Sequence, residues 1–132
     1  MIIENRHERL IAAPSDRIVP LIADLERVWP TQLAPPPRSQ ADGLYDAGPM
    51  LWQEIRRPGT VRAFRVVKPE GLQAEHAFEL EPRGPATVVR HAVWGRAVGE
   101  CEALWQTRIE PVHDLILEAF LDNVAAAVDR DA

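Results

Sequence analysis

The 132-residue chain has little of what several kinds of function require. Its one cysteine, Cys101, rules out an internal disulfide, so a reducing cytoplasm is the expected location. Its one lysine, Lys68, and its formal net charge of −5 argue against a nucleic-acid or anionic-membrane partner. No apolar run approaches the roughly 20 residues of a membrane span, and the N-terminus lacks the pattern of a signal peptide.

Motifs that would identify a reaction are missing as well. The sequence has no GxGxxG, Walker loop or GxSxG element, so nucleotide binding and serine hydrolysis lose their usual support. The four histidines, His7, His76, His91 and His113, are widely scattered along the chain, and no HxH, HxxxH or CxxC spacing occurs. We therefore expect no metal site and no cofactor.

The composition is that of a single globular domain covering residues 1–132. Apolar residues make up 46% of the chain and charged residues 27%, which are ordinary values for a soluble protein with a real core. Twelve prolines and seven glycines favour short elements joined by turns. The excess of arginine over lysine is typical of a high-GC genome.

Alternating side chains predict strands over most of the chain. Residues 3–12 read as a first strand with one partly polar face, typical of a strand beside a cavity or at a sheet edge. Ser15 or Pro14 opens a predicted helix that runs through Leu25 and ends at residues 28–30, and residues 34–43 form a proline-rich loop. Strand-like runs over residues 49–57, 61–68, 72–81 and 86–98 are joined by four-residue turns, which predicts an antiparallel meander.

The C-terminal segment, residues 101–130, carries the longest helical pattern. We expect its apolar residues to share one inward face: Val112, Leu115, Ile116, Ala119, Phe120, Val124 and Ala127. Asp114, Glu118 and Asp122 step along the other side, so that face is predicted to lie in solvent. Pro111 predicts a break or a kink in the helix.

Together these elements predict an α+β helix-grip fold, in which a curved antiparallel sheet wraps around the long C-terminal helix. The opening LIAAPSDRIVPLIADLERVWP and the ending LWQTRIEPVHDLILEAFLDNV resemble those of SRPBCC proteins, the superfamily of START and birch-pollen-allergen-like domains. The ending is similar to bacterial members of the polyketide cyclase or dehydrase type. The resemblance implies a hydrophobic cavity between sheet and helix that holds lipids, sterols, polyketides or aromatic metabolites. The superfamily has no shared catalytic motif, so no catalytic residue is assigned.

His76 is the most informative polar residue. It lies between Ala74 and Phe78 on the predicted inward face of its strand, where a histidine needs a hydrogen-bond partner or a shifted pKa. His113 follows Pro111 and is expected to point at the cavity mouth. The predicted ligand-binding residues are Trp52, His76, Phe78, Trp94, Val112, His113 and Leu115. The simpler alternative makes the histidines satisfied core residues and the tryptophans core or homodimer contacts.

Two functions follow from this sequence. The first is binding of a small hydrophobic or aromatic metabolite, with or without metal-free cyclase or dehydratase chemistry. The second is a non-catalytic protein-interaction or structural domain whose cavity is closed by its own side chains. The size of the space between helix and sheet separates the two.

Overall fold

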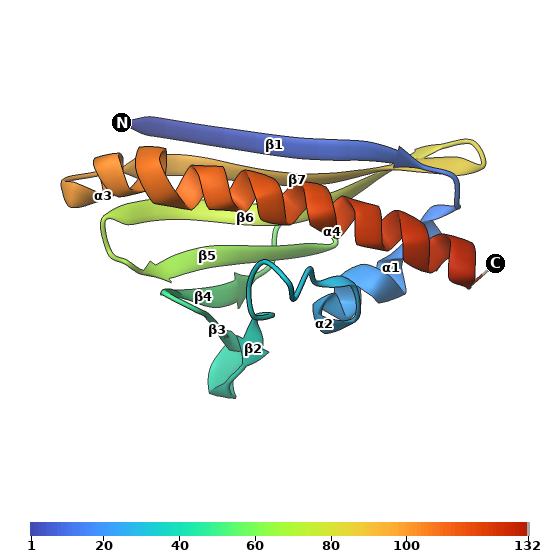
Figure 1. Cartoon of the computed structure of the whole chain (residues 1–132), viewed down its shortest axis with the longest axis horizontal. Coiled ribbons are helices and arrows are strands. Elements are labelled where there is room, and N and C mark those ends of the chain that lie inside the picture. Colours follow the sequence, from blue (N-terminus) through green and yellow to red (C-terminus); the bar gives the residue numbers. More distant parts are fainter. Residues whose placement is uncertain (132) are drawn as a thin grey trace.

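The computed structural model describes residues 1–131 and confirms the helix-grip α+β fold (Figure 1). Ala132, the last residue of the predicted domain, lies outside the described residues. The strands are β1 (Ile2–Ile11), β2 (Arg38–Ser39), β3 (Leu44–Ala47), β4 (Met50–Ile55), β5 (Arg62–Lys68), β6 (Leu72–Arg83) and β7 (Ala86–Ala97). The helices are α1 (Ser15–Ala23), α2 (Leu25–Val28), the short 3-10 turn η1 (Ala41–Gly43), α3 (Glu100–Leu104), the π-helical turn η2 (Trp105–Ile109) and α4 (Glu110–Arg130).

One antiparallel sheet contains seven strands in the order β1-β7-β6-β5-β4-β3-β2. The predicted meander is confirmed, since β4, β5, β6 and β7 are neighbours in chain order. β1 lies at one end of the sheet and pairs with β7. It is therefore an edge strand, as its polar face predicted. The segment expected to be only a loop, residues 34–43, contains β2 and η1. β2 pairs with β3, which follows this segment, and the pair extends the sheet at its other edge.

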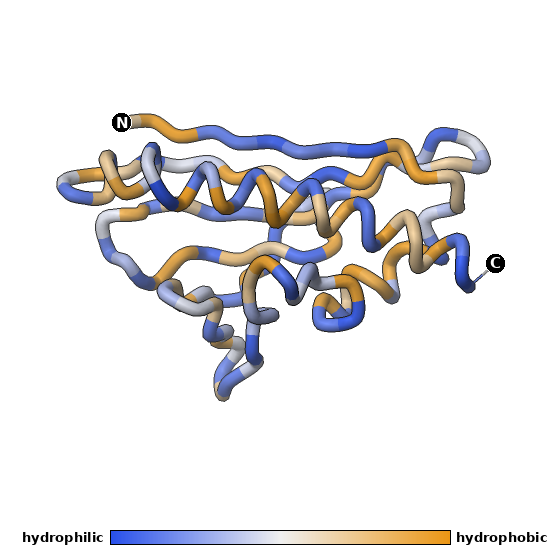
Figure 2. The backbone as a smooth tube through the Cα atoms, in the orientation of Figure 1, coloured by the Kyte–Doolittle hydropathy of each residue, from blue (hydrophilic) through white to orange (hydrophobic). Residues whose placement is uncertain are grey.

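α4 crosses one face of the sheet, and α1 and α2 pack near its C-terminal end (Figure 1). The main core lies between these helices and the sheet. Figure 2 shows most of β1 as hydrophilic. The buried residues of α4 are Leu117, Phe120, Leu121, Val124, Ala127 and Val128.

The predicted orientation of α4 about its own axis is wrong in its first half. The side chains of Val112 and Leu115 are 50% and 63% exposed, respectively, although we expected them to face the sheet. Asp114 and Glu118 were expected to face solvent, but both form hydrogen bonds with side chains of β1. The helix carries two overlapping apolar stripes, and the observed rotation buries the stripe that includes Leu117. The same rotation brings Asp114 and Glu118 against the polar face of β1.

The helical segment changes type just before Pro111, near the position where a break or a kink was predicted. Pro111 lies in the first turn of α4, directly after the π-helical turn η2. A proline has no N–H to donate to the preceding turn, and the wider π-helical turn before it lets the chain stay helical. No helix within residues 1–131 is both long and apolar enough to cross a membrane.

Candidate functional site

The fold brings all four histidines of the chain into one row. The ring centroids of His76 and His91 lie 5.3 Å apart, those of His91 and His113 5.2 Å, and those of His113 and His7 5.8 Å. The rings come from β6, β7, α4 and β1 in that order. The histidines are widely scattered along the chain, but they meet in space because strand pairing joins positions that are distant in sequence.

The inner histidines, His76 and His91, lie among aromatic rings. His76 stacks on Phe64 with ring centroids 5.1 Å apart, and its ring lies 4.3 Å from that of Trp52. His91 meets Phe78 edge-on at 4.7 Å. The predicted grouping of Trp52, His76 and Phe78 inside the grip is therefore found in the structure.

Several buried polar atoms of this region have no hydrogen-bond partner among the described residues. His76 Nδ1 and His91 Nε2 lie 3.3 Å apart and form one hydrogen bond. A buried polar atom without a partner costs about 1–3 kcal/mol, so such atoms are rare and point to a binding role or to water. The unpaired atoms are Trp52 Nε1, His76 Nε2, His91 Nδ1, and Nδ1 and Nε2 of His113.

Burial keeps these imidazoles neutral. Loss of water around the ring lowers the pKa of His76 to about 3, and the pKa of His113 to about 4. Burial likewise lowers the pKa of His91 well below its ordinary value, with a further contribution from His113. Each neutral ring offers one N–H donor and one nitrogen acceptor, which suits hydrogen bonding to a neutral ligand.

The outer end of the row is charged. His7 Nε2 lies 2.8 Å from Asp114 Oδ1, and His7 Nδ1 lies 2.6 Å from Glu118 Oε2. Burial alone would lower the pKa of His7, but the hydrogen bonds to Glu118 and Asp114 outweigh it and raise that pKa. Asn5 Nδ2 donates to Asp114 Oδ1 at 2.8 Å and to Glu110 Oε2 at 3.1 Å.

Sequence reasoning missed this outer cluster, although two signals indicated it. Asn5, His7 and Arg9 share one face of the first strand, because side chains two residues apart point the same way. Asp114 and Glu118 recur at a spacing of four on one helix face. The polar row on β1 and the acidic row on α4 face each other and form direct hydrogen bonds.

Three predicted ligand-binding residues lie elsewhere. The inward positions expected for Val112 and Leu115 are wrong, since both side chains are at least half exposed on α4. Strand alternation places Trp94 on the face of β7 opposite to His91, together with Arg90, which pairs with Glu8. The ring of His113, which is expected at the cavity mouth, lies 5.2 Å from that of His91.

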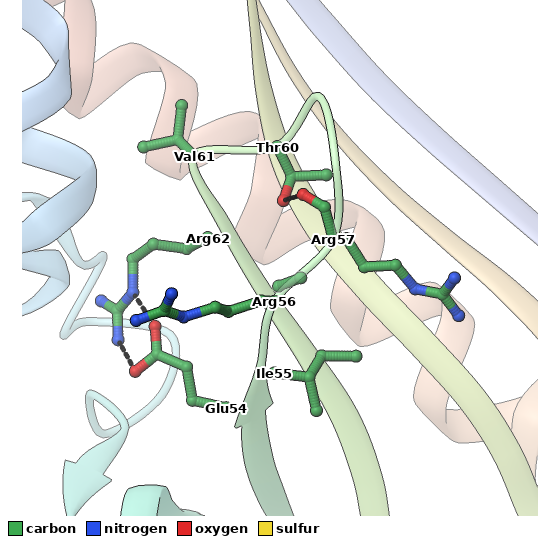
Figure 3. Close-up of a pocket in the computed structure, with 8 residues that line it drawn as sticks. Glu54, Ile55, Arg56, Arg57, Thr60, Val61 and Arg62 are labelled. Carbon is green, nitrogen blue, oxygen red and sulfur yellow. Dashed lines mark hydrogen bonds and ion pairs between the residues drawn. The ribbon is translucent and has the colours of Figure 1, made fainter.

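A hollow of about 660 Å³ opens outside the grip, at the turn between β4 and β5 (Figure 3). Arg62 donates from Nε and from one Nη to the two carboxylate oxygens of Glu54, at 2.9 and 3.1 Å. Arg57 pairs with Glu75. Most of the positive charge at this hollow is therefore satisfied within the protein, and the histidine row is the better candidate site.

Solved structures share the fold of this chain over nearly their whole length. A protein from Thermus thermophilus is 18% identical, with 98% of this chain and 99% of that chain covered and a TM-score of 0.65. The Zhui aromatase/cyclase from a Streptomyces species is 15% identical, with 98% and 95% covered and a TM-score of 0.65. Norcoclaurine synthase from Thalictrum flavum, in complex with dopamine and hydroxybenzaldehyde, is 13% identical, with 100% and 89% covered and a TM-score of 0.71.

These likenesses show that the chain has the helix-grip fold. The resemblance drawn from the two ends of the sequence is thus confirmed at the level of the fold. No protein-family profile matches the chain, and no curated protein matches its sequence.

Proposed function

We propose that this protein binds a small, mainly apolar or aromatic molecule between the sheet and α4. The observation that carries this proposal is the group of unpaired polar atoms on Trp52, His76 and His91, buried among aromatic rings. A ligand with an aromatic body and one or two polar groups would pair those atoms and keep the rings dry.

The shared fold supports the class of ligand. One structure with this fold is named an aromatase/cyclase, and another holds dopamine and hydroxybenzaldehyde. Those ligands and activities belong to those proteins. They support an aromatic or polyketide-like molecule here because the surroundings of His76 and His91 are themselves aromatic.

The pKa values favour binding over proton transfer at the inner histidines. A general base works best when its pKa lies near the working pH, and the pKa of His76 is about 3. His76 and His91 are therefore expected to orient the ligand by hydrogen bonds. If cyclase or dehydratase chemistry occurs, His7 is the expected proton donor, because its pKa is raised.

The second candidate function is that of a protein-interaction or structural domain with a closed interior. The close approach of Trp52, Phe64 and His76, with ring centroids 4.3–5.4 Å apart, favours it. In that case the polar atoms pair with water and the grip has no space for a metabolite. The homodimer expected from the tryptophans stays a prediction.

Binding of a fluorescent apolar probe, 1-anilinonaphthalene-8-sulfonate, to the native chain separates the two. We expect saturable binding that small phenols and aromatic aldehydes displace. Trp52→Phe should weaken binding about tenfold, because it removes the indole N–H and keeps most of the ring. Trp94→Phe is the matched control and should leave binding unchanged. A native chain that binds neither probe nor phenol supports the closed interior instead.

A further inference from the structure

The outer end of the histidine row carries the donor set of a transition-metal site. We propose that His7, His113 and Asp114, called the outer triad below, bind one divalent transition-metal ion of the zinc class. One donor atom from each residue lies within 4.8 Å of the other two. Two imidazoles and one carboxylate are a donor set that Zn²⁺ and its neighbours in the first transition row prefer.

The distances within the outer triad need only a small adjustment. His7 Nε2 and Asp114 Oδ1 are 2.8 Å apart, and His113 Nδ1 lies 4.0 Å from the same oxygen. Ligands about 2.0–2.1 Å from a tetrahedral ion lie about 3.3 Å from one another. Rotation of the His113 ring can close this gap, and it breaks no hydrogen bond because neither ring nitrogen has a partner within residues 1–131.

Neighbouring side chains already support the outer triad. Glu118 lies 2.6 Å from Nδ1 of His7 and can accept its N–H, which turns the lone pair of Nε2 toward Asp114. Asn5 donates to Asp114 Oδ1 and so holds that carboxylate in place. A carboxylate behind a ligating histidine and a hydrogen bond to the ligating carboxylate are the usual supports of a metal site.

The local charge suits a dication. Asp114 belongs to the triad, and two further carboxylates lie in its hydrogen-bond network, Glu118 beside His7 and Glu110 beside Asn5. Arg9, the nearest cation in this network, is directed to Glu118 and Asp122. Three protein ligands leave at least one coordination position for water or a ligand. The inference does not rest on the proposed metabolite, since the outer triad is separate from His76 and Trp52.

The test is zinc binding to the purified full-length chain after removal of metals with a chelator. We expect one Zn²⁺ per chain with a dissociation constant of about 1 µM or lower. A hundredfold excess over that constant should raise the thermal midpoint by roughly 10 °C. The imidazole nitrogen signals of His7 and His113 should shift on zinc addition, whereas those of His76 should not.

Variants separate this site from adventitious binding. His113→Gln, His7→Gln and Asp114→Asn should each weaken zinc binding at least a hundredfold, and Glu118→Gln about tenfold. Asp122→Asn is the control, because Asp122 lies on the same helix side and, within residues 1–131, pairs with Arg9 and not with the triad. His113→Gln breaks no protein hydrogen bond, so it should fold even if Asp114→Asn does not. Absence of stoichiometric zinc, or equal affinity in the native chain and His113→Gln, overturns the proposal.

Discussion

The two ends of the histidine row contain the same residue type in opposite surroundings. His76 and His91 lie among aromatic rings, and burial lowers the pKa of both. His7 lies between Asp114 and Glu118, and these carboxylates raise its pKa. The inner end favours a neutral ligand, whereas the outer end favours a cation.

The difference arises from the elements that supply the neighbours. β5 and β6 contribute Phe64 and Phe78 to the inner end, so loss of water dominates there. β1 is an edge strand, and its polar face meets the acidic side of α4. A buried histidine therefore has no single expected pKa, because desolvation and nearby charge act in opposite directions.

Phe64→Ala should have the largest effect on stability, since it removes an apolar ring from the inner end of the histidine row. Phe64 is fully buried and stacks on His76, so the variant should lose about 3–5 kcal/mol of unfolding free energy. Water entering the space should also raise the pKa of His76. Urea unfolding and imidazole NMR titration measure the two effects.

Tyr45→Phe is the control for that variant. Tyr45 meets Phe64 edge-on and accepts a hydrogen bond from Arg62, so the change should cost about 1 kcal/mol or less. An unchanged pKa of His76 in Phe64→Ala would show that burial by this ring is not its cause.

Acid should destabilise the native chain through the inner histidines. The pKa of His76 is about 3 in the folded state and about 6.5 in the unfolded state, so between these two pH values the unfolded state binds the proton and the folded state does not. The contribution of neutral His76 to the unfolding free energy is fully present above pH 6.5 and is lost as the pH falls toward 3. His76 alone should lower the unfolding free energy by about 2 kcal/mol between pH 7 and pH 5.

Urea unfolding at pH 7, 6 and 5 measures this dependence. His76→Phe keeps an aromatic ring beside Phe64, and its unfolding free energy should change less between pH 7 and pH 5 than that of the native chain. The same slope in both proteins would show that His76 is not the titrating group.

His7→Gln should have a smaller effect with the opposite pH dependence. The folded pKa of His7 is raised, so its stabilising contribution is fully present below pH 6.5 and is lost as the pH rises through the folded pKa. We expect His7→Gln to lower the unfolding free energy by about 1 kcal/mol or less at pH 6. At pH 9 the unfolding free energies of the variant and the native chain should differ by less. A difference that grows with pH would contradict the assignment of the ion pairs with Asp114 and Glu118.

Asp122→Asn should have the smallest effect. Asp122 pairs with Arg9 at an exposed position, and such pairs contribute about 0.2–1 kcal/mol. Raising the salt concentration from about 0.05 M to about 1 M should remove most of the difference from the native chain, because salt screens exposed charges. Thermal midpoints at both salt concentrations test this. A loss that salt does not reduce would indicate a packing role for Asp122.

Local patterns predicted much of the fold and the inner half of the site. The alternation of Ala74, His76 and Phe78 placed His76 on the inward face, and the four-residue turns predicted the meander. The orientation of α4 was not predictable from its own sequence, because Leu115 and Leu117 both belong to plausible apolar stripes. Only Leu117 is buried, since that rotation also pairs Asp114 with His7 and Asn5.

The sequence by itself determined the elements of this protein, because the period of two along strands and of about 3.6 along helices is a local property. It also determined that His76 faces the helix and that the first strand is polar on one side. Only the tertiary structure decided that His7, His91, His76 and His113 meet. That convergence depends on β1 pairing with β7 and on the rotation of α4, and both depend on contacts between residues about a hundred positions apart.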